Sequence, residues 1–384
     1  MTDNRNDWDP RSAKVQQDQA AAYDRMRGTC PVAHSEYMNW SLFKHEDVKR
    51  VLMDHETFSS KVSNHLSVPN GMDPPEHTVF RGVVDKYYTP QEMDRFEPVS
   101  RRITAALIDD LPRDKEIEIM GDFAQKFAFR NQSAFMGWPT ELERPLMDWV
   151  RKNHEATLAR DRQKMDELAY EFDGYIRALL VERRKARVDA VQDNTARLLF
   201  EEVDGRPLTE EEINSIIRNW TVGELSTIAT SVGIITNYLA DHPEVQDQLR
   251  ADRSLITAAT DEILRIQDSL VTNRRITTKP VEVGGRQLDA GSRLTIMWSS
   301  ANRDEAVFKN PDEFRLDRNP EDNLVYGAGI HECPGAPMAR LELRILLEEL
   351  FDRTSRILPV RDKPQLNAIY PAAGYSELFL RFTA

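Results

Sequence analysis

The chain has 384 residues, 40% of them hydrophobic and 30% charged, a balance typical of a folded globular protein. Its 51 Lys and Arg residues against 64 Asp and Glu residues give a formal net charge of −13, which argues against a dedicated nucleic-acid-binding protein. The only two cysteines, Cys30 and Cys333, exclude a disulfide scaffold and indicate a reducing compartment. The N-terminus has no signal core and no segment has the ~20 apolar residues of a membrane helix, so we expect a cytoplasmic protein.

No linker, repeat or composition break divides the chain, so we expect one domain over residues 1–384, with residues 1–15 loose. Apolar residues recur mostly at helical spacing, which predicts helices over 45–54, 76–88, 143–189 (as two helices), 209–240 and 337–351. Strands are few, and we expect them over 281–288 (a hairpin around Gly284-Gly285), 293–300 and 372–382. The predicted fold class is mainly α with a minor β region.

The clearest helix begins at Thr209, where Thr209 and Glu212 form a capping box. If it continues to Ala240, it is roughly 48 Å long at 1.5 Å per residue and crosses a whole domain. Gly223 lies inside it, where glycine costs about 1 kcal/mol relative to alanine. We therefore expect a functional reason for this glycine.

Cys333 lies in a glycine-rich turn just before the helix predicted over 337–351. Free backbone N–H groups at a helix N-terminus stabilise a thiolate, which favours a reactive or ligating cysteine. A zinc site is excluded because the other cysteine lies some 300 residues away and gives no ligand spacing. From the residues alone, a buried and inert cysteine in a turn is an equally good interpretation.

The stretch from Tyr326 to Arg340 resembles the haem-binding loop of the cytochromes P450. The positions that match its motif are Tyr326, Gly327, Gly329, His331, Cys333, Gly335, Ala339 and Arg340. The resemblance runs from about residue 20 to the end of the chain. It implies a triangular prism of helices, with haem b between the long central helix and the helix after the cysteine. It also implies that the Cys333 thiolate is the axial ligand of the iron.

Further matches to the same family occur in the expected order. Glu262 and Arg265 match its Glu-x-x-Arg pair, which the resemblance makes a buried brace rather than a surface ion pair. A third arginine often joins this pair, but Glu313 stands at its usual position, so we assign no third member. The residues that match the clamp for the haem propionates are His77, Arg81, Arg275 and His331.

The centre of the long helix departs from the family pattern. Counting back from Glu262 places Thr227 at the position of the family threonine and Gly223 at the first small position, next to bound oxygen. Ser226 replaces the usual acid, and Glu224 replaces the second small residue. Because Glu224 and Thr227 share a helix face, we expect Glu224 to supply protons while Thr227 and Ser226 position water. The alternative is that Glu224 points away from the haem and forms a salt bridge.

The resemblance implies a monooxygenase that activates O2 to hydroxylate or O/N-dealkylate a small organic substrate. No flavin or iron–sulfur segment is fused to the sequence, so electrons would come from a separate ferredoxin and its NAD(P)H-dependent reductase. Such a ferredoxin would dock on a basic face around Lys86, Arg340 and Arg344. Two alternatives stay open: a haem-thiolate enzyme that uses peroxide or no external electrons, and a non-catalytic haem-binding sensor. The short, partly polar loop over 61–72 would cover the pocket and suit a small substrate or one with a polar group.

Overall fold

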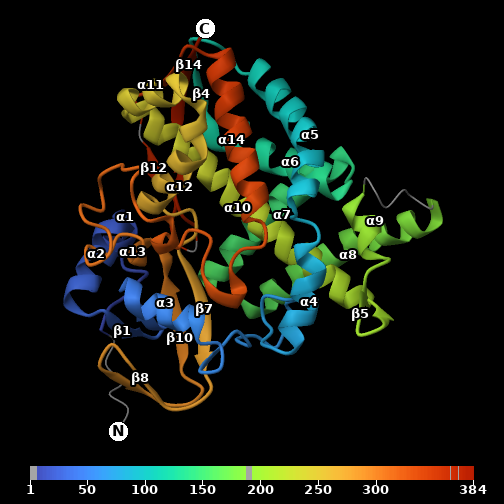
Figure 1. Cartoon of the computed structure of the whole chain (residues 1–384), viewed down its shortest axis with the longest axis vertical. Helices are drawn as coiled ribbons and strands as arrows, with labels where there is room; N and C mark the ends of the chain where they lie inside the picture. Colours follow the sequence, from blue (N-terminus) through green and yellow to red (C-terminus); the bar gives the residue numbers. More distant parts are fainter. Residues whose placement is uncertain (1–6, 187–192, 364, 371) are drawn as a thin grey trace.

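The computed structural model describes residues 7–186, 193–363, 365–370 and 372–384. Helices form most of the molecule, and a smaller β region lies beside them near the N-terminus (Figure 1). The helices are α1 (Ala13–Gln17), α2 (Gln19–Thr29), α3 (His45–Met53), α4 (Glu76–Asp85), α5 (Pro90–Asp109), α6 (Gln125–Met136), α7 (Glu143–Ala159), α8 (Arg162–Ala186), α9 (Asn194–Leu198), α10 (Glu210–Asp241), α11 (Pro243–Ala251), α12 (Ile256–Ile266), α13 (Trp298–Ala301) and α14 (Ala336–Arg353).

The main sheet has five strands in the order β1 (Val32–Ser35), β2 (Asn39–Leu42), β10 (Arg293–Met297), β7 (Thr272–Thr277) and β3 (Phe58–Ser59). Antiparallel pairing of β10 with β7 sets Leu294 opposite Arg275, which fixes where the Arg275 side chain leaves the sheet. A second sheet joins β11 (Arg356–Pro359), β14 (Phe379–Thr383) and β4 (Glu116–Glu118). The two-stranded pairs are β5 (Glu202–Val203) with β6 (Arg206–Pro207), β8 (Val281–Val283) with β9 (Arg286–Leu288), and β12 (Leu366–Asn367) with β13 (Tyr375–Glu377).

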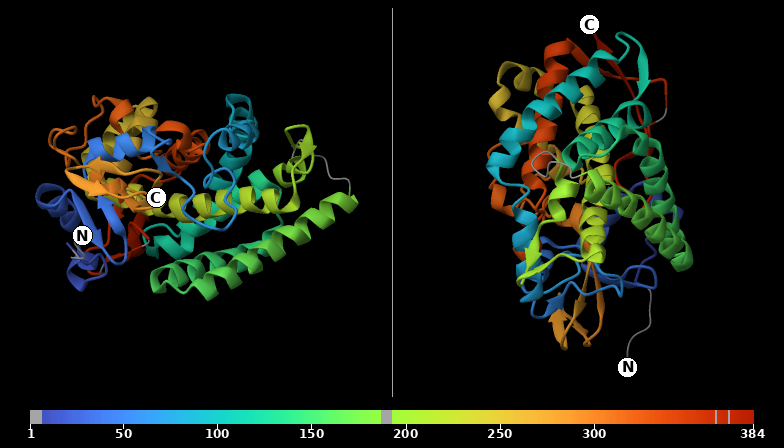
Figure 2. Two further views of the ribbon diagram at one scale, coloured as in Figure 1. Left: turned by 90° about the horizontal axis from the view of Figure 1, so that it is seen from below. Right: turned by 90° about the vertical axis from the view of Figure 1, so that its right-hand side faces the viewer.

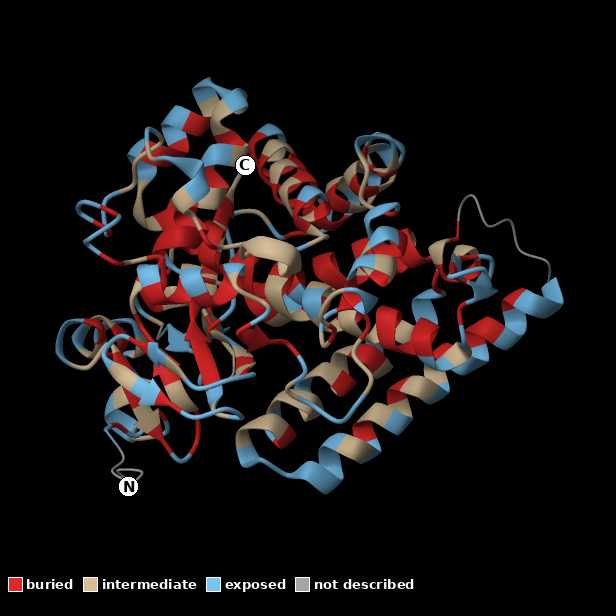
Figure 3. Ribbon diagram, turned by 60° about the horizontal axis from the view of Figure 1, so that its bottom comes forward, coloured by how far each residue is buried: buried red, intermediate tan, exposed pale blue. Residues whose placement is uncertain are grey.

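Helix α10 crosses the whole molecule, with α7 and α8 along one side of it (Figure 2). The predicted capping box is present: Thr209 Oγ1 accepts from the Glu212 N–H at 3.2 Å, and Glu212 Oε2 accepts from the Thr209 N–H at 2.7 Å. The C-terminal half of α10 is almost continuously buried, whereas the helices at the rim are buried on one side only (Figure 3). The long helix α10 therefore forms the central element that supports the site.

The predicted mainly-α fold is confirmed, and the principal helices begin and end within a few residues of their predicted bounds. The predicted helix end at residue 189 lies outside the described residues. The hairpin at Gly284-Gly285 is also confirmed, since both glycines have positive φ, 52° and 78°. The predicted strand over 293–300 is too long, because the chain turns into α13 at Trp298. Within the segment 1–15 expected to be loose, residues 1–6 lie outside the described residues, and Trp8 is buried against Tyr23 and Phe43.

Within the described residues, no helix has both the length and the apolar character needed to cross a bilayer.

Candidate active site

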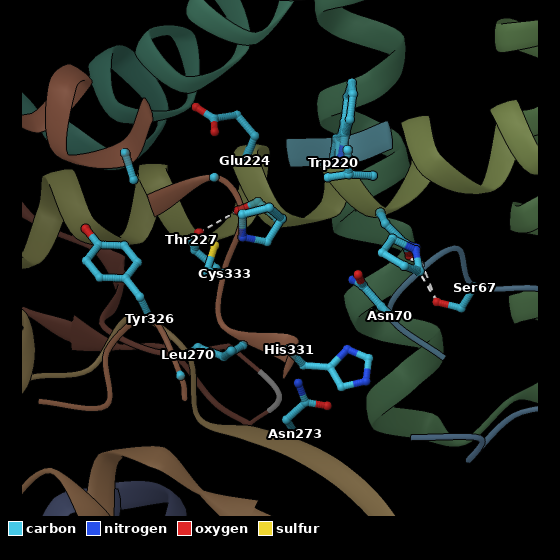
Figure 4. Close-up of a pocket in the computed structure, with 18 of the residues that line it drawn as sticks. Ser67, Asn70, Trp220, Glu224, Thr227, Leu270, Asn273, Tyr326, His331 and Cys333 are labelled. Atoms are coloured by element: carbon cyan, nitrogen blue, oxygen red, sulfur yellow. Dashed lines mark hydrogen bonds between the residues drawn. The ribbon is translucent and has the colours of Figure 1, made fainter. Parts of the chain in front are cut away.

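A cavity of about 490 Å³ lies between α10 and the loop that carries Cys333. Figure 4 shows that Glu224 and Thr227 approach this cavity from α10, while His331 and Cys333 approach it from the loop. Both predicted halves of the site, the cysteine motif and the centre of the long helix, thus meet at one cavity. This is the arrangement expected for a flat cofactor held between them.

Cys333 lines this cavity and its side chain is exposed there. Burial raises the pKa of the thiol, whereas backbone N–H groups of Gly335 and Ala336 at the start of α14 lower it. The backbone N–H of Cys333 donates to the Tyr326 carbonyl oxygen at 2.8 Å, which closes the turn. The thiol therefore lies at the N-terminus of α14, where a thiolate bound to a metal is stabilised by backbone dipoles.

Glycines shape the loop that carries the cysteine. Gly327 and Gly329 have positive φ, 80° and 72°, a conformation that costs other residues energy. A Cβ at Gly329 would also lie 2.5 Å from the backbone oxygen of Leu52. A Cβ at Gly335 would make only ordinary contact, at 3.8 Å from the Cys333 sulfur. Gly329 thus lets the loop pass close to α3.

Three predicted clamp residues have buried polar groups that lack a compensating charge among the described residues. The rings of His77 and His331 lie 4.4 Å apart, and the Nε2 atom of each is buried without a hydrogen-bond partner. Arg275 is buried, donates to the backbone oxygen of Arg274 and forms no ion pair with a described residue. Burial lowers the pKa of Arg275 to about 10. Buried polar groups without a counter-charge suit an anionic ligand, and the two propionates of a haem fit them.

Arg81 also lines the cavity, but its guanidinium is mainly engaged with the cysteine loop. It donates to the backbone oxygens of Ile330 at 3.1 Å and Glu332 at 2.6 Å, and it forms an ion pair with Asp85. It therefore holds the loop against α4. Three of the four predicted clamp residues, Arg81, Arg275 and His331, line this cavity, and His77 packs against His331.

The Glu262–Arg265 pair is a buried brace. Arg265 Nε donates to Glu262 Oε2 at 2.7 Å, and its other nitrogens donate to the backbone oxygens of Asn302 and Pro311. A third arginine is present: Arg318 Nε donates to Glu262 Oε1 at 2.8 Å. The sequence interpretation missed Arg318 because the family arginine was expected just before Phe314, where this chain has Glu313. Arg318 instead lies four residues after Phe314. The brace ties α12 to the segment that leads into the cysteine loop.

On α10, Gly223, Glu224 and Thr227 line the cavity as predicted. A Cβ built on Gly223 would meet no atom within 4 Å, so this position opens directly into the cavity. Thr227 Oγ1 donates to the Gly223 backbone oxygen at 2.5 Å, the i−4 bond common for helical threonine. The role expected for Ser226 is not supported by its position. Ser226 lines a separate cleft on the other side of α10, where its hydroxyl lies 3.2 Å from His154 Nε2.

Glu224 has a partner that the sequence interpretation did not foresee. Its carboxyl faces Glu342 of α14, and Glu342 is 0% exposed. Burial raises the pKa of Glu224 to about 7, while the Glu342 carboxyl lowers it. Burial and the charge of Glu224 raise the pKa of Glu342 well above its ordinary value. The salt bridge of the alternative interpretation is not found among the described residues. The sequence could have pointed to Glu342, because this acid lies on the buried face of α14, one turn after Met338.

The remaining part of the cavity has a partly polar roof. The lining residues from the loop between β3 and α4 are Ser60, Val62, Ser63, His65, Ser67, Pro69, Asn70 and Gly71. Trp220 and Leu270 line this cavity, whereas Leu225 and Ala372 line the cleft behind α10. Val271 and Tyr370 lie in the hydrophobic core.

The basic face expected around the cysteine loop is neutralised by neighbouring acids. Lys86 forms an ion pair with Glu201 at 2.7 Å, and Arg340 forms one with Asp261 at 2.9 Å. Arg344 pairs with Glu97 at 2.7 Å and also with Glu348. These cations are therefore not free charges, which weakens the long-range field that the sequence interpretation attributed to them.

A family profile described as Cytochrome P450 matches residues 132–368. The chain is 33% identical over 350 residues to cyclomarin C epoxidase CymV of Salinispora arenicola, covering 86% of this chain and 88% of that protein. It is 31% identical over 355 residues to the erythromycin C-12 hydroxylase of Saccharopolyspora erythraea, covering 89% and 88%. A solved structure, CYP109E1 from Bacillus megaterium in complex with corticosterone, superposes with a TM-score of 0.85 at 27% identity, covering 97% of this chain and 100% of that one.

These likenesses extend over nearly the full length of the chain and include the cavity described above. The chain therefore belongs to the cytochrome P450 family, as a monooxygenase that carries haem b on a cysteine thiolate.

Proposed function

We propose that this enzyme hydroxylates or O/N-dealkylates a small organic substrate, with O2 and with electrons from a separate ferredoxin and reductase. The observation that carries the proposal is the shared cavity, which the Cys333 sulfur and the Gly223–Thr227 face of α10 both line. In this assignment the Cys333 thiolate would ligate the haem iron, and His77, Arg275 and His331 would hold the propionates, with Arg81 holding the loop. Bound haem supplies the oxygen chemistry, and the protein orients the substrate and excludes water.

The reduced carbon monoxide complex tests this assignment. The wild type should absorb at the red-shifted position typical of thiolate-ligated haem, and Cys333→Ser should lose that band. Cys30→Ser is the matched control, because Cys30 lies away from the cavity beside Val32 and should leave the spectrum unchanged. A histidine-type spectrum in the wild type would contradict the assignment.

The substrate side of the cavity favours an apolar molecule with a polar group. Trp220 and Leu270 provide apolar surface, and the roof adds the hydroxyls of Ser60, Ser63 and Ser67. Two relatives are named for epoxidation of cyclomarin C and C-12 hydroxylation of erythromycin, and a structural neighbour binds corticosterone. A spectral-shift screen of steroids, macrolides and smaller terpenoids tests the class, because a bound substrate displaces the iron's water ligand. Shifts with wholly apolar molecules alone would contradict the need for a polar group.

Proton delivery in this proposal belongs to Glu224 and Thr227. Glu224 is the one carboxylate among the described residues that line the cavity. Its carboxyl is turned away from the Thr227 hydroxyl (Figure 4), so water in the cavity would complete the path. Glu224→Gln should keep haem and substrate binding but slow the oxygen step roughly 10²-fold and divert electrons to peroxide. Unchanged turnover and unchanged peroxide release would eliminate this role.

NADPH consumption with a surrogate ferredoxin and reductase tests the electron supply. We expect consumption to rise on substrate binding and product to appear in proportion. Product formed with added peroxide but none with reductase would favour the peroxide-using alternative.

A further inference from the structure

Glu224 and Glu342 form a buried carboxyl pair without a compensating cation among the described residues. Glu224 Oε1 and both carboxyl oxygens of Glu342 are buried, and they have no hydrogen-bond partner other than the facing carboxyl of the pair. Two other buried carboxylates are compensated by cations: Glu262 receives two arginines, and Glu349 of the same helix as Glu342 receives Arg101 and Arg353. Asp268 is also buried without an ion pair, but it accepts from Asn302 and from the Leu270 N–H. The Glu224–Glu342 pair has neither kind of partner.

Burying an unpaired carboxylate is costly, and two facing carboxylates cannot both stay ionised in such surroundings. The pair consequently keeps at least one proton and carries at most one negative charge. Glu342 is the more deeply buried member, so it retains the proton and Glu224 is the member that titrates. The pKa of Glu224, about 7, places this titration in the neutral range.

The charge on Glu224 acts on the cysteine thiol. Burial raises the pKa of Cys333 most, and the negative charge of Glu224 raises it by a smaller amount. The Tyr88 phenol, whose pKa burial raises well above its ordinary value, also faces Glu224, Cys333 and Glu342, and it is neutral near pH 7. Electrostatic coupling is reciprocal, so any added negative charge at the thiolate-bound iron must raise the proton affinity of Glu224.

We propose that Glu224, facing a permanently protonated Glu342, takes up a proton when the haem is reduced. One electron from an external reductant converts the ferric to the ferrous iron, and one proton from solvent binds the Glu224 carboxylate. The net charge of this region then stays constant, and the proton is stored three residues from Thr227. The inference rests on the proposed haem site and adds how Glu224 is loaded before the oxygen step.

The test is the midpoint potential of the haem as a function of pH, measured in the holoprotein with a chemical reductant. In the wild type the potential should be flat below about pH 7, where Glu224 is already protonated, and should fall as pH rises above it. Glu224→Gln should give a flat profile over the same range. A reduced-minus-oxidised infrared spectrum should show a protonated carboxyl band that shifts in D2O and is lost in Glu224→Gln.

Two further variants separate this role from general damage. Glu342→Gln keeps a neutral group of the same shape opposite Glu224. The midpoint potential of this variant should therefore still fall as pH rises above about 7. Glu348→Gln removes an arginine-paired carboxylate from the same helix and should leave the profile unchanged. A fall that persists in Glu224→Gln, or a flat profile in the wild type or in Glu342→Gln, would overturn the inference. Each variant must first show the thiolate-type carbon monoxide spectrum, so a failed haem site is recognised separately.

Discussion

Arg318 donates a hydrogen bond to Glu262 across 2.8 Å, although 56 residues separate them in the sequence. Glu262 thus receives Arg318 from one side and Arg265 from the other. Arg318 also donates to the backbone oxygens of Lys309, Asn310 and Glu313. This triad fastens the segment before the cysteine loop to α12, and so it sets the position of the sulfur.

The brace should be essential for haem retention. Arg265→Ala leaves Glu262 with less compensation in a buried site, and we expect a loss of about 3–5 kcal/mol in stability. Arg318→Ala should act in the same direction. The measurement is chemical denaturation together with the haem content of the purified protein.

Arg315→Ala is the matched control for the brace. The Arg315 side chain pairs with exposed Asp317, and only its backbone N–H reaches Glu262. We expect the free energy of unfolding to change by no more than about 0.5 kcal/mol and the haem content to be normal. Normal haem content in Arg265→Ala would reduce the pair to an ordinary helix contact.

Arg275 should stabilise bound haem without stabilising the haem-free protein. Its guanidinium is buried without an ion pair, so Arg275→Leu removes a charge that only a ligand compensates. We expect faster haem transfer to an acceptor apoprotein, with unfolding of the haem-free variant unchanged or shifted to higher denaturant. Arg274→Leu is the control at the neighbouring, less buried position. Equal transfer rates for Arg275→Leu and the wild type would remove Arg275 from the clamp.

If a ferredoxin docks near the cysteine loop, Arg344 and its partner Glu97 should change its association rate in opposite directions. Arg344→Gln removes a cation and should lower the rate, whereas Glu97→Gln leaves Arg344 less neutralised and should raise it. Both effects should shrink as salt increases. Stopped-flow reduction at several ionic strengths measures them. Changes of the same sign in both variants would indicate structural damage instead of docking.

His154 should make the protein less stable as pH falls below about 6.5. Burial lowers its pKa in the folded state, so the unfolded chain binds this proton more readily than the folded protein. The stability that depends on neutral His154 is therefore present above pH 6.5 and is lost as pH falls toward the lowered pKa. His154→Gln should flatten this part of the pH dependence in denaturation experiments. Ser226→Ala should leave the pH dependence of stability unchanged, because burial of the imidazole lowers the pKa of His154 and the Ser226 hydroxyl does not. Equal slopes of stability against pH in His154→Gln and the wild type would refute the prediction.

Local sequence determined much of this protein. The capping box at Thr209, the glycine turn before the β9 strand and the Gly-rich loop before Cys333 act over a few residues, so their patterns predict the structure directly. The spacing of Gly223, Glu224 and Thr227 placed them on one helical face, and all three line the cavity. The same geometry explains why Ser226 lines a different cleft, because a residue adjacent to Thr227 points about 100° away around the helix.

Only the tertiary structure decided which distant groups meet these faces. Helical periodicity shows which side of α14 is buried, but the packing of α14 near α10 decides that Glu342 meets Glu224 rather than a cation. The path of the chain after Pro311 likewise selects Arg318 for the brace, and acids on other helices neutralise the cations around the cysteine loop. Long-range pairing depends on how whole elements are oriented, which no local spacing encodes.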